Sequence, residues 1–116
     1  MKIIKNNIDT FELTSDKISN NDIHLTNVKK VHLKKLSVVD NITIINCPSV
    51  TIEDSSTILK MVIVNSHVMI HNTDHIQRLY CTSAIIGLID CSFLGVQHCL
   101  KFSKGCAVAM SRCYHI

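Results

Sequence analysis

The fold is decided by a stretch in the first half of the chain, Asn41-Ile42-Thr43-Ile44-Ile45-Asn46-Cys47-Pro48-Ser49-Val50-Thr51-Ile52. Two short apolar runs with the period of two that is typical of β-strands flank a polar segment. That segment contains no Asn-Gly or Asp-Gly pair of the kind that closes a hairpin. The stretch therefore predicts two short strands joined by a corner and disfavours an antiparallel meander.

The same pattern repeats along the whole chain. Division into the units 2–21, 22–40, 41–60, 61–77, 78–96 and 97–116 aligns five mostly apolar columns. These columns are Ile3, Ile23, Ile42, Val62, Leu79 and His98; Lys5, Leu25, Ile44, Val64, Cys81 and Leu100; Phe11, Val31, Val50, Val68, Ile85 and Cys106; Leu13, Leu33, Ile52, Ile70, Gly87 and Val108; and Ile18, Val38, Ile58, Ile76, Leu94 and Cys113.

A repeat of 17 to 20 residues, with two clear strands and a weaker third in each unit, predicts an all-β fold, a single-stranded parallel β-helix of about six coils. We expect the polar pairs Asn46-Cys47, Asn65-Ser66, Thr82-Ser83 and Asp90-Cys91 to form its corners at similar phases, because short polar side chains tolerate left-handed backbone. A small β-sandwich is the alternative fold.

Composition agrees with a single β-helix domain over 1–116. The chain is 47% hydrophobic but 4% aromatic, with three Gly, one Pro and no Trp, which excludes collagen, low-complexity and disordered classes. A narrow interior filled by stacked Ile, Val and Leu explains the shortage of aromatic rings.

Charge and hydropathy restrict the partners and the compartment. The net charge is +3, and the basic cluster Lys29, Lys30, Lys34 and Lys35 lacks interleaved aromatics, so we expect a solvated face rather than a nucleic-acid site. No apolar run approaches the length of a membrane span, and the first residues lack a secretory signal, so we expect no membrane contact and a cytoplasmic location.

Six cysteines, at 47, 81, 91, 99, 106 and 113, are expected to be free buried thiols, as is usual in the cytosol. Their intervals of 34, 10, 8, 7 and 7 residues do not match the Cys pairs of a structural zinc site. We therefore expect no metal or other cofactor to be held by them.

The stretch from Asn41 to Ile52 and its neighbours within 22–96 resemble the β-helical domain family of cyclase-associated protein and tubulin-binding cofactor C. The coils of that family read as an apolar triplet, Asn-Cys or a similar pair, and a second apolar triplet. The resemblance implies a right-handed β-helix that offers a flat sheet to a cytoskeletal partner: an actin monomer, tubulin or a small GTPase.

Ile76-Gln77-Arg78-Leu79-Tyr80 is similar to the segment of the cofactor C branch in which an arginine acts on a partner GTPase. The resemblance implies a catalytic candidate at Arg78, since a planar guanidinium suits developing phosphate charge. Gln77 is adjacent to the arginine, whereas the family has an apolar residue between them, and a second glutamine is missing. A solvated arginine at a corner is the alternative.

Two histidines are the metal candidates. Alternation along His67-Val68-Met69-Ile70-His71 places His67, Met69 and His71 on one outward face, where a threefold oligomer could gather copies around an ion, as in a viral or phage structural protein. Exposed histidines without a metal are the alternative. No Ser-His-Asp set, phosphate loop or carboxylate pair stands out, so we expect no stand-alone enzyme.

The two ends of the chain differ. The first coil carries Lys2, Lys5, Asp9, Glu12, Asp16 and Lys17, a charged edge that resists pairing. The last coil, 97–116, is mostly apolar, which predicts that a second copy or another protein covers it, with a homodimer expected. We take Arg78, Tyr80, Phe102, Met110 and Tyr114 as the candidate partner-binding residues.

Overall fold

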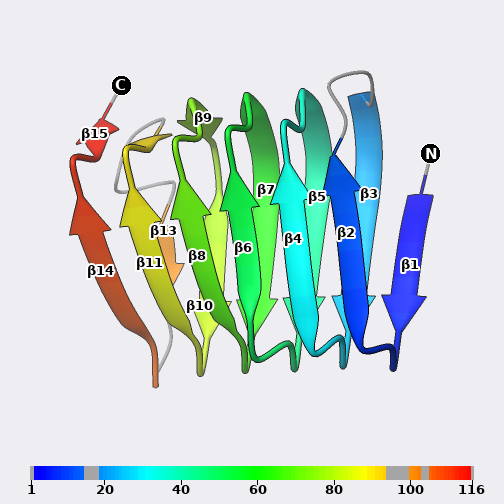
Figure 1. Cartoon of the computed structure of the whole chain (residues 1–116). Coiled ribbons are helices and arrows are strands. Elements are labelled where there is room, and N and C mark those ends of the chain that lie inside the picture. Colours follow the sequence, from blue (N-terminus) through cyan, green and yellow to red (C-terminus); the bar gives the residue numbers. More distant parts are fainter. Residues whose placement is uncertain (1, 15–18, 94–99, 103–104, 116) are drawn as a thin grey trace.

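The chain forms a β-solenoid of about five turns in the computed structural model, with parallel strands stacked from β1 at one end to β14 and β15 at the other (Figure 1). The structure describes residues 2–14, 19–93, 100–102 and 105–115, and places no helix among them. The strands are β1 (Lys2–Asn6), β2 (Thr10–Thr14), β3 (Ser19–Thr26), β4 (Lys30–Lys34), β5 (Val38–Ile45), β6 (Val50–Glu53), β7 (Thr57–Val64), β8 (His67–His71), β9 (His75–Ile76), β10 (Leu79–Thr82), β11 (Ile85–Ile89), β12 (Ser92–Phe93), β13 (Leu100–Phe102), β14 (Ala107–Ser111) and β15 (Tyr114–His115).

Two parallel sheets enclose the core. Sheet A contains β1, β3, β5, β7, β9, β12 and β15 in that order, with β10 beside β7 and β13 beside β10. Sheet B contains six strands in the order β2, β4, β6, β8, β11 and β14. The β-helix fold predicted from the repeat is thereby confirmed. In the described part of the chain, no helix is long and apolar enough to cross a membrane.

The weaker third strand of each unit is a short extension of sheet A. In β5 and β7 it is continuous with the longer strand: Val39 pairs with Ile58, and pairing resumes at Asn41 and Lys60. In the following coils this third strand is separate and forms β9 and β12. Ile76 of β9 pairs with Ile58 of β7 on one side and with Phe93 of β12 on the other.

The core consists of side chains from alternate positions of both sheets. One file on sheet A runs Ile23, Ile42, Met61 and Leu79, and one on sheet B runs Val31, Val50, Val68 and Ile86; all are at most 2% exposed. Such stacking gives an aliphatic interior in which each β-branched chain packs on its equivalent in the next coil.

The predicted columns are one residue out of register at several points. Met61, Ile63, Ile86, Leu88 and Val39 point inward where Val62, Val64, Ile85, Gly87 and Val38 were predicted. Both Met61–Val64 and Ile85–Ile89 are apolar at nearly every position, so a period of two cannot decide which residues face inward.

The last coil is also shifted relative to its predicted columns. Leu100 and Phe102, rather than His98 and Leu100, pair with Leu79 and Cys81. Val108 and Met110, rather than Cys106 and Val108, pair with Ile86 and Leu88. His98, Ile18 and Leu94 lie outside the described residues.

Each coil turns at corners held by residues with positive φ. Asn7, Asn27, Asn46, Asn65 and Ser83 form the first corner, with φ between 49 and 55°. The Asn27 amide donates to Asn7 Oδ1 at 2.9 Å, and Asn65 donates to Asn46 Oδ1 at 2.8 Å. Short polar side chains thus occupy the left-handed positions, as predicted.

Asp90 does not belong to the same phase as these asparagines, contrary to the prediction. It stacks in the second corner, which is made by Lys35, Asp54, Asn72, Asp90 and Arg112, all with positive φ. The side chain of Asn72 donates to Asp54 Oδ1 at 3.0 Å, and Arg112 Nε donates to Asp90 Oδ1 at 2.6 Å. The Asp90-Cys91 pair resembles Asn46-Cys47 in sequence, but it follows a strand of sheet B, whereas Asn46 follows a strand of sheet A.

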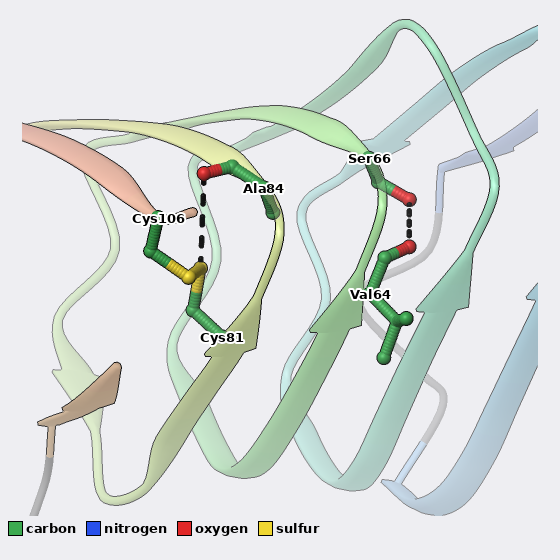
Figure 2. Close-up of a disulfide and its surroundings, with 5 residues drawn as sticks. All are labelled: Val64, Ser66, Cys81, Ala84 and Cys106. Carbon is green, nitrogen blue, oxygen red and sulfur yellow. Dashed lines mark hydrogen bonds between the residues drawn. A yellow bond between two sulfur atoms is a disulfide. The ribbon is translucent and has the colours of Figure 1, made fainter. Parts of the chain in front are cut away.

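Cys81 and Cys106 form a disulfide that ties the last coil to the one before it (Figure 2). This corrects the expectation of free thiols at these two positions. Their Cα atoms are 6.4 Å apart, within the range that a disulfide spans, because Cys106 stacks at the corner beside the end of β10. Cys47 and Cys91 are free and buried, as expected, and Cys113 is free but only partly buried. Cys99 lies outside the described residues.

Candidate interaction surface

The outer face of sheet B changes from polar to apolar along the stack. Its central row is Glu12, His32, Thr51, Met69, Gly87 and Ala109, and a neighbouring row is Thr14, Lys34, Glu53, His71, Ile89 and Ser111. The charged and hydroxyl side chains belong mainly to β2, β4 and β6, whereas no charged residue occurs in β11 or β14. The face formed by β11 and β14 is therefore free of charge.

The large exposed side chain of this apolar face is Ile85, the first residue of β11, which stacks between His67 and Ala107 and is 53% exposed. Beside it, Met69 lies over Gly87: a Cβ at Gly87 would meet Met69 Sδ at 2.5 Å. Gly87 thus makes room for the thioether, and the two residues form a low apolar surface next to Ile85. We refer to Met69, Ile85, Gly87, Ile89, Ala107 and Ala109 as the apolar face.

The edge of sheet B at the same end is also apolar. β14 is the edge strand, and no charged residue occurs between Gly105 and Ser111. Met110 pairs with the fully buried Leu88 but is itself 44% exposed. Val108 is partly buried against the core. The core is thus open toward solvent at β14.

The opposite end of the stack is covered by charge. Lys5 occupies the position of the buried Leu25 in the next coil, yet it is exposed, with its Nζ 5.7 Å from the centre of the Phe11 ring. An inward-directed lysine on an edge strand opposes addition of a further strand. Lys5 gives a physical basis for the expectation that the charged edge of the first coil resists pairing.

The candidate residues from the sequence fall on different surfaces. Arg78 is exposed immediately before β10, and its carbonyl accepts the Met61 N–H at 2.9 Å. Tyr80 is half-buried on the outer face of sheet A, and Lys60 Nζ lies 5.8 Å from its ring centre. Arg78 and Tyr80 are therefore on sheet A, whereas Met110 is on sheet B. Phe102 and Tyr114 belong to β13 and β15, also in sheet A.

His67 and His71 lie on the outer face of sheet B, as the alternation predicted, with Val68 and Ile70 buried between them. Four residues along a strand separate the two by about 13 Å. One ion cannot contact both within a single chain. Within the described ranges, no three His, Cys, Asp or Glu side chains gather into a group able to hold a metal ion.

A polar hollow of ≈ 330 Å³, which was not predicted from the sequence, lies at the other end of the same face. Its lining includes Glu12, Lys30, His32, Thr51 and Glu53. His32 Nε2 and Glu53 Oε1 form a hydrogen bond of 2.7 Å between neighbouring strands. These residues are 21 apart in sequence, so only a correct diagonal register could have found the pair.

The free buried thiols are poor nucleophiles. Burial raises the pKa of Cys91 to about 11 and also raises that of Cys47. A thiol must be deprotonated to attack a substrate, so these cysteines stay inert at neutral pH. Hydrogen bonding to Arg112 lowers the pKa of Asp90 at the exposed second corner.

Comparison of the chain with protein-family models, with curated proteins and with solved structures gives no match. The functional interpretation therefore depends on the surface itself.

Proposed function

We propose that this β-solenoid is a non-catalytic protein-binding module that contacts its partner through the apolar face and the adjoining edge of β14. The observation that carries the proposal is the change in charge along the outer face of sheet B. Strands β2, β4 and β6 carry charged side chains, whereas β11 and β14 carry none. Contiguous apolar surface bordered by polar residues is typical of interaction sites.

The energetics favour Ile85 as the anchor of the contact. Burying the exposed half of an isoleucine side chain contributes about 1 kcal/mol, half of the roughly 1.5–3 kcal/mol for a whole side chain. Gly87, Ala107 and Ala109 around it have little side-chain entropy to lose on binding. A rigid, two-sheet scaffold therefore presents a flat surface with little cost of ordering.

Actin and tubulin are the partners to test first, because the coils resemble those of the cyclase-associated protein and cofactor C family. That choice rests on the resemblance. The apolar face itself specifies a flat, largely uncharged partner surface.

The test compares two lysine substitutions on the same face of sheet B. Ile85→Lys puts a charge at the most prominent large side chain of the apolar face. Ser49→Lys puts the same charge at an exposed position immediately before β6, among polar neighbours. Circular dichroism first establishes that both variants fold.

Binding to immobilised actin and tubulin and self-association by sedimentation velocity are then measured for both variants. We expect Ile85→Lys to weaken at least one of these associations tenfold or more and Ser49→Lys to leave them unchanged. Equal behaviour of the two variants in all three measurements would refute the proposal.

A further inference from the structure

We infer that the partner at the β14 edge is a second copy of this chain, joined by antiparallel pairing of the two β14 strands about a twofold axis at Ala109. The inference rests on the proposed function and specifies its partner and geometry. In this arrangement the six strands of sheet B continue directly into the six strands of sheet B in the second copy.

The first support is the chemistry of the edge. An edge strand leaves a row of backbone N–H and C=O groups without strand partners, and proteins usually protect such edges with charge, proline or bulges. β14, with the sequence Ala107-Val108-Ala109-Met110-Ser111, has no charge and no proline. All five of its residues pair with β11 in unbroken register, so a bulge does not protect it either.

The second support is the match of side chains in one register. Pairing centred on Ala109 sets Val108 of one copy against Met110 of the other, and Ala107 against Ser111. A twofold axis perpendicular to the sheet keeps the inner faces of both copies on the same side. Val108 and Met110, which are incompletely buried in one chain, then continue the core of both copies.

The outward side chains allow this approach. Ala107, Ala109 and Ser111 are small, and none is charged. Shifting the register by one residue would set core-facing positions against outward-facing ones. The arrangement centred on Ala109 therefore preserves both faces, whereas a shift of one residue in either direction does not.

The same physical reasoning disfavours head-to-tail stacking. In that arrangement the first coil of one copy would cover the last coil of another and would continue the interior file that contains Lys5. Lys5 would then be buried at the junction without a carboxylate partner in that file, and burial of an unpaired charge is strongly unfavourable. The contact between like ends closes after two copies and leaves Lys5 in solvent.

Site-directed disulfide formation tests the register. In the intact chain with Cys113→Ala, which removes a partly exposed thiol, Ala109→Cys places one cysteine against its twofold equivalent. Directly opposed residues of antiparallel strands are 4.5–5.5 Å apart at Cα, within the range for a disulfide. Oxidised glutathione serves as the oxidant: two thiols lose two protons and two electrons, and one glutathione disulfide is reduced to two glutathione thiols.

We expect Ala109→Cys to give a covalent dimer, identified by the linked peptide in mass spectrometry, and the Cys113→Ala parent to give none. Ala107→Cys and Ser111→Cys variants should cross-link to each other in a mixture more than tenfold faster than either does alone. The Thr51→Cys variant, on an inner strand of the same sheet, is the matched control and should not cross-link.

Sedimentation separates failure of the inference from failure of the proposed function. A dimer without the Ala109 cross-link would overturn this register and leave protein binding at this end intact. A monomer at high micromolar concentration, or a species that grows steadily with concentration, would overturn the twofold dimer. Val108→Lys, which copies the inward lysine of the first coil, should convert the dimer to a folded monomer.

Discussion

The corner serine Ser66 offers the sharpest test of how this solenoid is held together. Its hydroxyl donates to the Val64 carbonyl at 2.8 Å (Figure 2). The same hydroxyl accepts the Cys47 N–H at 3.0 Å, and the residue is 6% exposed. The Ser66→Ala substitution removes both bonds without changing the backbone. The Val64 carbonyl keeps the Asn46 N–H as a donor at 3.0 Å, whereas the Cys47 N–H loses its acceptor.

The loss of stability in Ser66→Ala therefore comes mainly from the buried Cys47 amide. Leaving a buried donor without a partner costs about 1–3 kcal/mol, so we expect Ser66→Ala to lower the free energy of unfolding by about 2 kcal/mol. With a denaturant slope of about 2 kcal/mol per molar urea, the midpoint falls by about 1 M. Urea titration followed by far-ultraviolet circular dichroism measures this shift.

Ser56→Ala is the matched control, because Ser56 is exposed and its hydroxyl contacts the hydroxyl of Thr57 at 3.5 Å. We expect a change within about 0.5 kcal/mol for this variant. Amide hydrogen exchange adds a local readout, since the Cys47 amide should lose protection in Ser66→Ala. Unchanged stability together with full protection of that amide would show that the corner hydroxyl does not support the coil.

Three further predictions concern the thiols and Arg78. The cysteines of the Cys81–Cys106 disulfide are 25 residues apart, and its reduction should lower the free energy of unfolding by about 3 kcal/mol. The urea midpoint should fall when reducing buffer is added, but not in a Cys81→Ala/Cys106→Ala variant. Burial raises the pKa of Cys91 from 9.0 to about 11, so its contribution to stability is complete below pH 9 and is lost as pH rises through 11. Cys91→Ala should flatten that alkaline decline, and a decline of equal steepness would contradict the assignment. Because Arg78 is exposed, Arg78→Ala should change stability by less than about 0.5 kcal/mol, measured by urea titration. Loss of stimulated GTP hydrolysis in that variant, assayed with candidate small GTPases, is the outcome that a catalytic arginine requires.

The repeat made the fold predictable because a solenoid is built from local, nearly identical units. Asn41-Ile42-Thr43-Ile44 and Val50-Thr51-Ile52 alternate clearly between apolar and polar positions, and the predicted inward positions in both are correct. The predicted inward positions were wrong in Met61–Val64 and Ile85–Ile89, where apolar and polar residues do not alternate. There the hydrogen-bonded register with the neighbouring coils, rather than the strand's own sequence, selects the inward side chains.

The candidate site was less predictable, since it depends on which residues stack across coils. Composition predicts the apolar last coil as a contact region, and this role remains a proposal. The apolar face was missed, because Ile85 was assigned to the core and its exposure follows from the register of β11 with β8. The His32–Glu53 pair and the Cys81–Cys106 disulfide were missed for the same reason.

The sequence by itself determined the parallel β-helix, its two strong strands and weaker third strand per coil, and the polar corners, because each depends on residues close together in the chain. The tertiary structure decided which side of β11 faces solvent, which cysteines meet, and where the open edge of the core lies. Those features depend on register between coils about nineteen residues apart, and a shift of one residue exchanges inside for outside.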